Sequence, residues 1–392
     1  MREWHIITPE YPPQVGGVAD YTSLLAQHLQ AAGESPHVWA PGSDEHASSG
    51  SNLHRTLGSF DAASLAAADL SLDQFARPRS LLVQWVPHGY GRRSMNVGFC
   101  RWLARRVRLH GDSLHLMVHE PFLEFRGIRQ SAAAAVHRWM IHTLLGAAEH
   151  VWLSIPAWEP MLRPYAPANL EMDWLPIPST IPLAATPESV KSVRAKVGLP
   201  RFLAGHLGTY STAIRKMLEP VIIDLVRRHE DLTFLLLGSG SDRFRFALAS
   251  QYPDVTNRLF ATDYLPSAQL SPYLAACDLV VQPYPDGASS RRTSLMAGIS
   301  HGIPVLTTSG HLSEPLWRDS AAVALVSAND PVSLIASAHA LVRSPEERSR
   351  LGAAGLRLYR ERFDWEQLIC KLSATAVPQK PAIVAACGHQ PR

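Results

Sequence analysis

The chain has few cysteines, no strong excess of one charge and no apolar run long enough to cross a bilayer. Its four cysteines lie far apart, so the sequence contains neither a CxxC metal motif nor a disulfide framework. The 37 Lys and Arg residues are nearly balanced by 34 Asp and Glu residues, which gives no indication of a nucleic-acid partner. The opening MREWHIITPEYPP reaches proline too early for a signal peptide, so we expect a cytoplasmic protein.

What the sequence does contain is an alternation of short apolar runs with longer helical patterns, which is typical of parallel sheets joined by crossover helices. A length of 392 residues favours two such domains or one large α/β unit. The expected strands are 4–8, 37–40, 80–86, 114–119, 150–154, 172–176, 202–207, 233–237, 259–261, 279–282, 305–308 and 322–325. The clearest helical patterns are 19–32, 96–109, 131–148, 331–342 and 345–363. The polar, Ala- and Ser-rich sequence at 42–69 predicts no definite element.

Ligands of open parallel sheets bind beyond the carboxyl ends of the strands, so we expect the binding residues in the loops that follow the strands. The loop after the first expected strand carries Gly16 and Gly17 at a predicted helix start. Adjacent glycines let the backbone approach a ligand and leave N–H groups free for an oxyanion or a hydroxyl. A simple tight turn is the alternative interpretation.

The whole loop from Pro9 to Tyr21 resembles the opening of family 4 glycosyltransferases, in which a PP-x-x-GG segment precedes the first helix. The resemblance covers about residues 1–365. Its further motifs are 84–88 (QWVPH), 118–121 (VHEP), 175–179 (LPIPS), 205–210 (GHLGTY), 236–240 (LLGSG), 276–283 (ACDLVVQP), 302–305 (GIPV) and 363–365 (FDW).

This resemblance implies an α/β chain of the GT-B fold, with two Rossmann-like domains whose parallel sheets face a central cleft. We therefore expect an acceptor-side domain over 1–182 and a nucleotide-sugar-binding domain over 183–363. A helix at about 364–376 is expected to pack back on the first domain, before a disordered tail at 377–392. The implied activity transfers a sugar, with retention, from a nucleotide-diphosphate sugar to a glycan, lipid-linked or small-molecule acceptor.

The donor leaves as a diphosphate, so helix amino ends and cationic side chains are needed where negative charge grows. Residues Gly208, Thr209 and Tyr210 open a predicted helix with Arg215 and Lys216 in its early turns, and Gly238 follows the next strand. In the family an Arg and a Lys downstream of this strand clamp the diphosphate. A solvated surface position is the alternative for either residue here.

A second candidate donor loop runs into a helix after the strand at 279–282, and small, hydroxyl and cationic residues there suit phosphate and sugar hydroxyls. Its candidate residues are Asp286, Gly287, Ser289, Ser290, Arg291, Arg292 and Thr293. Capping of the helix by a hydroxyl is the alternative. Most family members carry a Glu-x7-Glu pair here, but this chain has Ser289 and Ala297, with Asp286 and Glu314 as nearby acids. We expect Gly208, Arg215, Lys216 and the segment around Ser290 to converge on one hollow.

On the acceptor side, His119 matches a family histidine at a strand end, and we expect it to be catalytic by donating a hydrogen bond to a sugar hydroxyl or the reacting centre. Glu120 and Glu124 follow in the same loop, and the remaining acceptor-side candidates are Asp20, Tyr21, His88 and Tyr90. The helix with Arg101, Arg105, Arg106 and Arg108 also carries aromatic residues, a pattern typical of an anionic membrane surface; an ordinary helix with a solvated basic face is favoured.

No acidic pair of the DxD type ends a strand in the second half, so we expect neither a metal ion nor a cofactor beyond the nucleotide sugar as co-substrate. Two alternative functions remain. A sugar-nucleotide epimerase of the same fold would need carboxylates beside the donor sugar, and no matching set is found. A nucleotide-sugar-binding protein without activity is the other alternative, because the Glu pair is absent.

Overall fold

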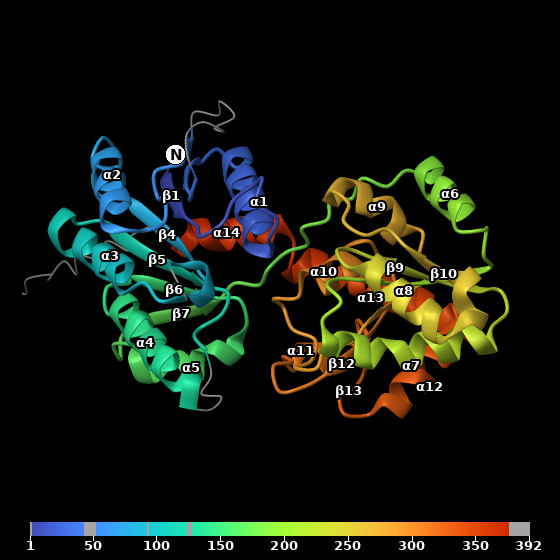
Figure 1. Cartoon of the computed structure of the whole chain (residues 1–392). Helices are drawn as coiled ribbons and strands as arrows, with labels where there is room; N and C mark the ends of the chain where they lie inside the picture. Colours follow the sequence, from blue (N-terminus) through green and yellow to red (C-terminus); the bar gives the residue numbers. More distant parts are fainter. Residues whose placement is uncertain (1, 43–51, 92–93, 124–127, 376–392) are drawn as a thin grey trace, which may run out of the picture.

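Buried apolar runs form the strands of two parallel sheets, one in each half of the chain (Figure 1). The structure is a computed structural model that describes residues 2–42, 52–91, 94–123 and 128–375. The predicted tail at 377–392 and Glu124 lie outside the described residues. Within the described ranges, no helix combines the length and apolar character needed to cross a membrane.

The first sheet has the strand order β3-β2-β1-β4-β5-β6-β7, and all its pairings are parallel. Helices cover both faces of such a sheet, so its central strands are apolar on both sides, and every residue of β4 is buried. Its strands are β1 (Glu3–Ile7), β2 (Ser35–Trp39), β3 (Leu53–His54), β4 (Ser80–Trp85), β5 (Ser113–Val118), β6 (His150–Leu153) and β7 (Glu171–Trp174).

Side chains of β1 alternate between the two faces of this sheet. Trp4 and Ile6 pack in one cluster with α1 (Gly17–Ala31) and α14 (Trp365–Thr375), whereas Ile7 packs in the cluster of the opposite face. The helices of that opposite face are α2 (Ala62–Leu72), α3 (Val97–His110), α4 (Ile128–Leu145) and α5 (Glu159–Leu162). Short 3-10 helices lie at Pro87–Gly89, Pro156–Trp158 and Arg163–Tyr165.

The second sheet has the order β10-β9-β8-β11-β12-β13 and is again parallel throughout. Its strands are β8 (Phe202–Leu207), β9 (Leu232–Leu237), β10 (Leu259–Ala261), β11 (Leu279–Gln282), β12 (Val305–Ser309) and β13 (Ala324–Ser327). The helices are α6 (Pro187–Lys196), α7 (Thr212–Arg228), α8 (Ser241–Gln251), α9 (Ser267–Ala275), α10 (Thr293–Ser300), α11 (Leu316–Asp319), α12 (Pro331–Arg343) and α13 (Pro345–Arg362), with a 3-10 helix at Pro253–Arg258.

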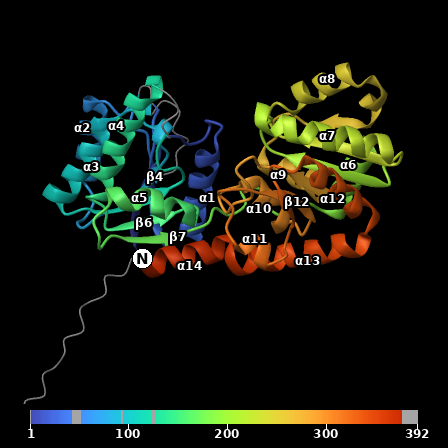
Figure 2. The same ribbon diagram turned by 90° about the horizontal axis from the view of Figure 1, so that it is seen from below.

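The chain passes between the domains twice. The segment from β7 to α6 makes the first crossing and contains the boundary predicted at 182/183. The second crossing runs from α13 to α14, and Figure 2 shows α13 under the second domain and α14 under the first. Trp365 stacks on His28 of α1, and its indole Nε1 donates to the Ser179 carbonyl at 3.0 Å.

The structure differs from the sequence prediction mainly between 42 and 72. Strand β3 and helix α2 were not predicted there, although Asp61 caps α2 by accepting a hydrogen bond from the Ser64 amide. At the other predicted elements the ends move by a few residues: α1 begins at Gly17 rather than at 19, and β13 begins at Ala324 rather than at 322.

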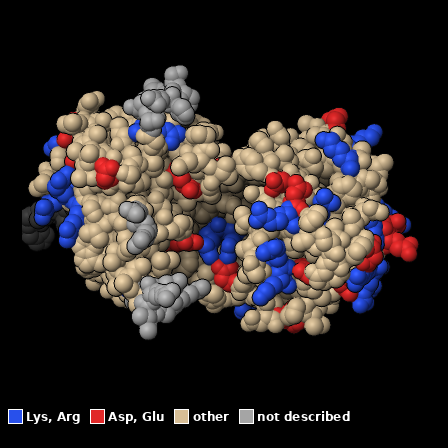
Figure 3. Space-filling model, in the orientation of Figure 1, with Lys and Arg blue, Asp and Glu red and all other residues tan. Residues whose placement is uncertain are grey.

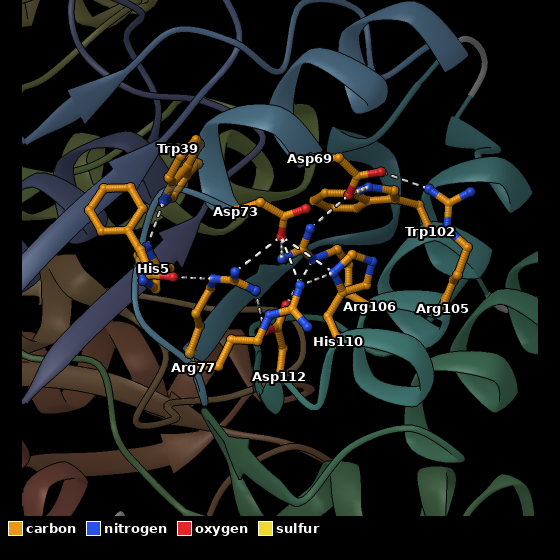
Figure 4. Close-up of polar contacts among 12 residues, drawn as sticks. His5, Trp39, Asp69, Asp73, Arg77, Trp102, Arg105, Arg106, His110 and Asp112 are labelled. Carbon is orange, nitrogen blue, oxygen red and sulfur yellow. Dashed lines mark hydrogen bonds and ion pairs between the residues drawn. The ribbon is translucent and has the colours of Figure 1, made fainter.

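The arginines of α3 are divided between the surface and the interior: Arg101, Arg105 and Arg108 are exposed, whereas Arg106 is turned inward. Arg106 is fully buried and reaches Asp69, Asp73 and Asp112 at 3.0, 3.0 and 2.7 Å (Figure 4). Arg105 is paired with Asp69 at 2.7 Å. The aromatic residues Phe99 and Trp102 pack in the core, and Arg106 belongs to an internal ion network that joins α2, α3 and the start of β5. The exposed arginines fit the favoured interpretation of an ordinary helix with a solvated basic face.

Candidate functional site

Loops that follow β1, β4, β5 and β7 meet the loop that follows β11 in a pocket of about 330 Å³, called here the interdomain pocket. All the strands are parallel, so this is the carboxyl edge of both sheets. Figure 3 shows the hollow between the domains, with basic and acidic atoms on its walls. The pocket is lined by Glu10, Gly16, Gly17, Val18, Tyr21, Val86, His88, His119, Glu120, Ile177, Arg291 and Thr293.

The amino end of α1 is occupied by the protein's own carboxylate. Oε1 of Glu10 accepts hydrogen bonds from the amides of Val18 and Ala19, each at 3.0 Å. A Cβ on Gly16 would lie 2.2 Å from this oxygen, so glycine is required for the carboxylate to approach. Glu10 thus uses the Val18 and Ala19 amides, so these two N–H groups are not free for an oxyanion as expected, although Gly16 and Gly17 do line the interdomain pocket.

His119 follows β5 and lines the interdomain pocket, with its ring set edge-on against Tyr21. Its Nε2 lies 2.8 Å from Oε1 of Gln84, so this nitrogen donates to the amide oxygen. Burial lowers the pKa of His119 to about 3, which keeps the ring neutral near pH 7. The donor nitrogen is thus taken, which corrects the expected donor role and leaves Nδ1 as the acceptor.

Tyr90 is a correction to the predicted acceptor side. Its ring is fully buried between Trp85 and Phe99, and its hydroxyl donates to the Gln84 carbonyl at 2.7 Å. A side chain with its whole surface in the core cannot stack on a sugar. The aromatic packing of the first domain, rather than ligand binding, accounts for this residue.

The other acceptor-side candidates differ in their access to the pocket. Tyr21, His88 and Glu120 line it, and the Glu120 carboxylate lies 3.5 Å from Nδ1 of His88. Asp20 is exposed in the first turn of α1 and is not among the lining residues. The structure therefore brings Tyr21, His88 and Glu120 together at the pocket and leaves Asp20 outside its lining.

The loop after β11 carries a compact charged group. The Asp286 carboxylate pairs with both Arg291 and Arg292, and although burial opposes its ionisation, these guanidinium groups lower its pKa. Arg291 reaches across the domains to Glu120 at 3.4 Å and lies over the Trp158 ring at 5.5 Å. The positive charge of Arg291 is therefore already matched by two carboxylates.

Ser290 joins the domains instead of facing a ligand, which corrects its predicted donor role. Its buried hydroxyl lies 2.8 Å from the Ser154 carbonyl and also contacts Oε1 of Glu314, so two acceptors share its single proton. The hydroxyl accepts a hydrogen bond from Trp174 Nε1 at 2.9 Å. Its amide donates to Oε1 of Glu314 at 2.9 Å, and burial raises the pKa of that carboxyl. Ser289 is equally buried, and its hydroxyl has no partner among the described residues.

A second hollow of about 380 Å³, called here the arginine pocket, lies beyond β8 and β9 at the amino ends of α7 and α8. Neither Arg215 nor Arg243 makes an ion pair with a described residue, and Nε of Arg215 is buried without a partner. Lys216 is exposed and lies outside the hollow. The lining residues are Thr209, Tyr210, Ser211, Arg215, Ser239, Gly240, Arg243 and Phe244.

Three of the predicted glycines serve backbone contacts. A Cβ on Gly238 would lie 2.6 Å from the Gly208 carbonyl oxygen, so glycine lets the loops after β8 and β9 touch. Gly287 has a φ of +93°, and a Cβ there would lie 2.2 Å from the Gly310 nitrogen. These glycines shape the edge of the sheet and do not line either pocket.

Residues 202–344, which contain the arginine pocket, match the family model described as glycosyl transferases group 1. This segment is therefore similar to group 1 glycosyl transferases. No curated protein matches the chain in sequence.

Solved structures similar to the whole chain include a sucrose-phosphate synthase from Thermosynechococcus elongatus, with 16% identity and a TM-score of 0.70 over 96% of this chain and 98% of that chain. Anabaena HepE in complex with UDP and glucose has 14% identity and a TM-score of 0.69, over 96% and 99%. A trehalose-6-phosphate protein from E. coli bound with UDP-2-fluoro glucose has 12% identity and a TM-score of 0.65, over 95% and 98%. The predicted GT-B fold of two Rossmann-like domains is thereby confirmed.

The predicted donor-side residues of the second domain are divided between two places. Thr209, Tyr210 and Arg215 line the arginine pocket, whereas Arg291 and Thr293 line the interdomain pocket. The expectation that Gly208, Arg215, Lys216 and the segment around Ser290 would converge on one hollow is wrong. Ser290 is used between the domains, and Lys216 lies on the exposed side of α7.

Sequence reasoning missed Arg243 and Glu10. Arg243 lies in the first turn of α8, directly after the Gly-Ser-Gly turn at 238–240, and that position could have indicated it. Glu10 lies within the glycine loop itself, but only the folded loop shows its carboxylate at the helix end.

The two positions of the missing Glu pair, Ser289 and Ala297, are both fully buried in the second domain. In the described part of the chain, no group of three or more His, Cys, Asp or Glu residues is arranged to hold a metal ion.

Proposed function

We propose that the protein transfers a sugar from a nucleotide-diphosphate sugar to an acceptor hydroxyl. The observation that supports this most directly is the arginine pocket, in which two cations without carboxylate partners meet two helix amino ends within the segment similar to group 1 glycosyl transferases. Negative charge grows on the diphosphate as the glycosidic bond breaks, and this environment stabilises that charge.

In this proposal the arginine pocket binds the nucleotide diphosphate, and the interdomain pocket holds the sugar and the acceptor. We also propose retention of configuration, by attack on the face from which the diphosphate leaves. The acceptor oxygen bonds to the anomeric carbon, the bond to phosphate breaks, and a phosphate oxygen takes the acceptor proton. No protein nucleophile is then required, so the protein acts by positioning and electrostatics.

His119 has a positioning role in this scheme. Because the pKa of His119 is lowered to about 3, the neutral ring holds no extra proton to give to a leaving group. Its Nδ1 can accept a hydrogen bond from a sugar or acceptor hydroxyl. We place the reaction in the cytoplasm, which is supported by the free thiols of Cys100, Cys277 and Cys370.

A nucleotide-sugar-binding protein without transferase activity is the second candidate. It is favoured by one observation: Ser289 and Ala297 leave the family's two carboxylate positions without a charge, and both are sealed in the core. Release of nucleotide diphosphate from a bound donor separates the two functions, because only the enzyme produces it.

Calorimetric titration with UDP-, GDP- and ADP-sugars tests the donor site. Each of Arg215→Ala and Arg243→Ala should weaken binding by about 1.5–3 kcal/mol, or roughly tenfold to a hundredfold in Kd, because each removes a charge-assisted hydrogen bond. Binding of the nucleoside alone should hardly change. Lys216→Ala is the matched control, since this neighbouring cation lies outside the pocket. Equal losses in all three variants, or no nucleotide-sugar binding by the unmodified protein, would refute the assignment.

A further inference from the structure

The amino end of α1 is a place where phosphate would ordinarily be stabilised, since it combines free backbone amides with the positive end of the helix dipole. In this protein Glu10 already holds the Val18 and Ala19 amides, and the absence of a Cβ on Gly16 makes room for it. A phosphate or carboxylate entering the interdomain pocket therefore meets a fixed negative charge where it would otherwise find donors.

The remaining charges of the interdomain pocket also disfavour an entering anion. Arg291 is the one Lys or Arg among its lining residues, and it is bound by Asp286 at 2.7 Å and by Glu120 at 3.4 Å. Glu10 and Glu120 are both lining residues. The pocket thus has carboxylates in excess of cations, which is the reverse of the arginine pocket.

From this contrast we propose that the acceptor is an uncharged polyhydroxy compound, and that Glu10 is the specificity-determining residue that excludes phosphorylated and carboxylated acceptors. The inference rests on the proposed transferase function and names the substrate class of its acceptor site. Anionic groups are confined to the arginine pocket, and the interdomain pocket takes hydroxyls.

The pocket has acceptors for such hydroxyls. Oε1 of Glu10 takes both amide bonds, which leaves Oε2 without a hydrogen-bond partner among the described residues. His119 Nδ1 and the Glu120 carboxylate lie on the same wall. All three groups accept hydrogen bonds and none supplies a proton, which suits hydroxyl donors and disfavours anionic oxygens.

A phosphate titration tests the role of Glu10 directly. All proteins carry Arg215→Ala and Arg243→Ala, so that phosphate binding at the arginine pocket is reduced equally, and inorganic phosphate is titrated by calorimetry. Glu10→Ala vacates the helix end and should tighten phosphate binding by about tenfold, as expected for a charge-assisted site. Glu10→Gln keeps the capping oxygen without its charge and should show a smaller gain.

Glu188→Gln is the matched control, because Glu188 is an exposed acid in the first turn of α6. It should bind phosphate as the parent does. Thermal melting checks that each variant is folded. Phosphate affinity that is unchanged in both folded Glu10 variants would overturn the role of Glu10.

Transfer assays then compare uncharged mono- and disaccharides with their phosphorylated counterparts. The unmodified protein should have a higher kcat/KM for the uncharged sugar than for its phosphorylated counterpart. Glu10→Ala should lower the ratio of these two kcat/KM values. A preference for the phosphorylated member would overturn the acceptor class while leaving the transferase function intact. Failure to bind any nucleotide sugar would instead refute the proposed function, and the phosphate titration would still decide the role of Glu10.

Discussion

Replacing Ser290 by Ala should weaken the contact between the two domains and leave the affinity for the nucleotide sugar unchanged. The hydroxyl connects the Ser154 carbonyl and the Trp174 indole, which belong to the first domain, to a loop of the second. Removing it leaves one buried acceptor and one partly buried donor unpaired, while the Ser290 amide still holds Glu314. An unpaired buried polar group costs about 1–3 kcal/mol, so we expect a loss of roughly 2–4 kcal/mol in the free energy of unfolding.

Urea unfolding followed by tryptophan fluorescence measures this loss, and calorimetry with a nucleotide sugar measures donor affinity. Ser289→Ala is a close control, because the neighbouring hydroxyl is equally buried but has no partner. Its removal should be neutral or slightly stabilising. Equal unfolding free energies for the two variants would refute the connecting role. If Ser290→Ala lowered the affinity for the nucleotide sugar without lowering the free energy of unfolding, Ser290 would instead be a donor-binding residue.

Two further predictions concern stability. Asp112→Ala removes the fully buried partner of Arg79 and Arg106 and should cost about 3–5 kcal/mol in urea unfolding, whereas Asp254→Ala, which breaks an exposed pair, should cost less than about 1 kcal/mol; equal losses would contradict the internal network. Burial lowers the pKa of His119 to about 3 and of His206 to about 4, so their neutral forms stabilise the fold fully above about pH 6.5 and this stability is lost as the pH falls towards 4. Urea unfolding at pH 7 and pH 5 should show a lower free energy of unfolding at pH 5, and His206→Gln should make this difference smaller. A difference of the same size in the His206→Gln variant would contradict the contribution of His206.

The sheets were predictable because parallel strands buried on both faces leave a clear mark in the sequence. The run Ser80–Trp85 is apolar at four of its six positions and is flanked by turn residues, so β4 was located almost to the residue. Helix α2 was missed because its alanines are spread around the helix and give little periodicity. Its position is set by contacts with α3 and by the ion pairs of Asp69 and Asp73, which no local pattern contains.

The candidate site was predictable only at the level of loops. Strand ends mark where the pockets form, and the loops after β1, β5, β8 and β11 do line them. The fate of each side chain depended on distant partners: Ser290 is held by a carbonyl 136 residues away. Tyr90 is buried by aromatic packing and does not line the pocket. Arg215, which follows β8, and Arg291, which follows β11, line different pockets.

The placement of α14 has a consequence for synthesis of the chain. One hydrophobic cluster of the first domain takes Trp4 and Ile6 from its beginning and Trp365, Leu368 and Leu372 from beyond the second domain. The ribosome therefore releases the first sheet with this face covered by α1 alone, and α14 joins it only after the second domain has been made. Since α14 follows the second domain in the chain, the first domain is completed only after the second has been translated, and the two do not mature independently.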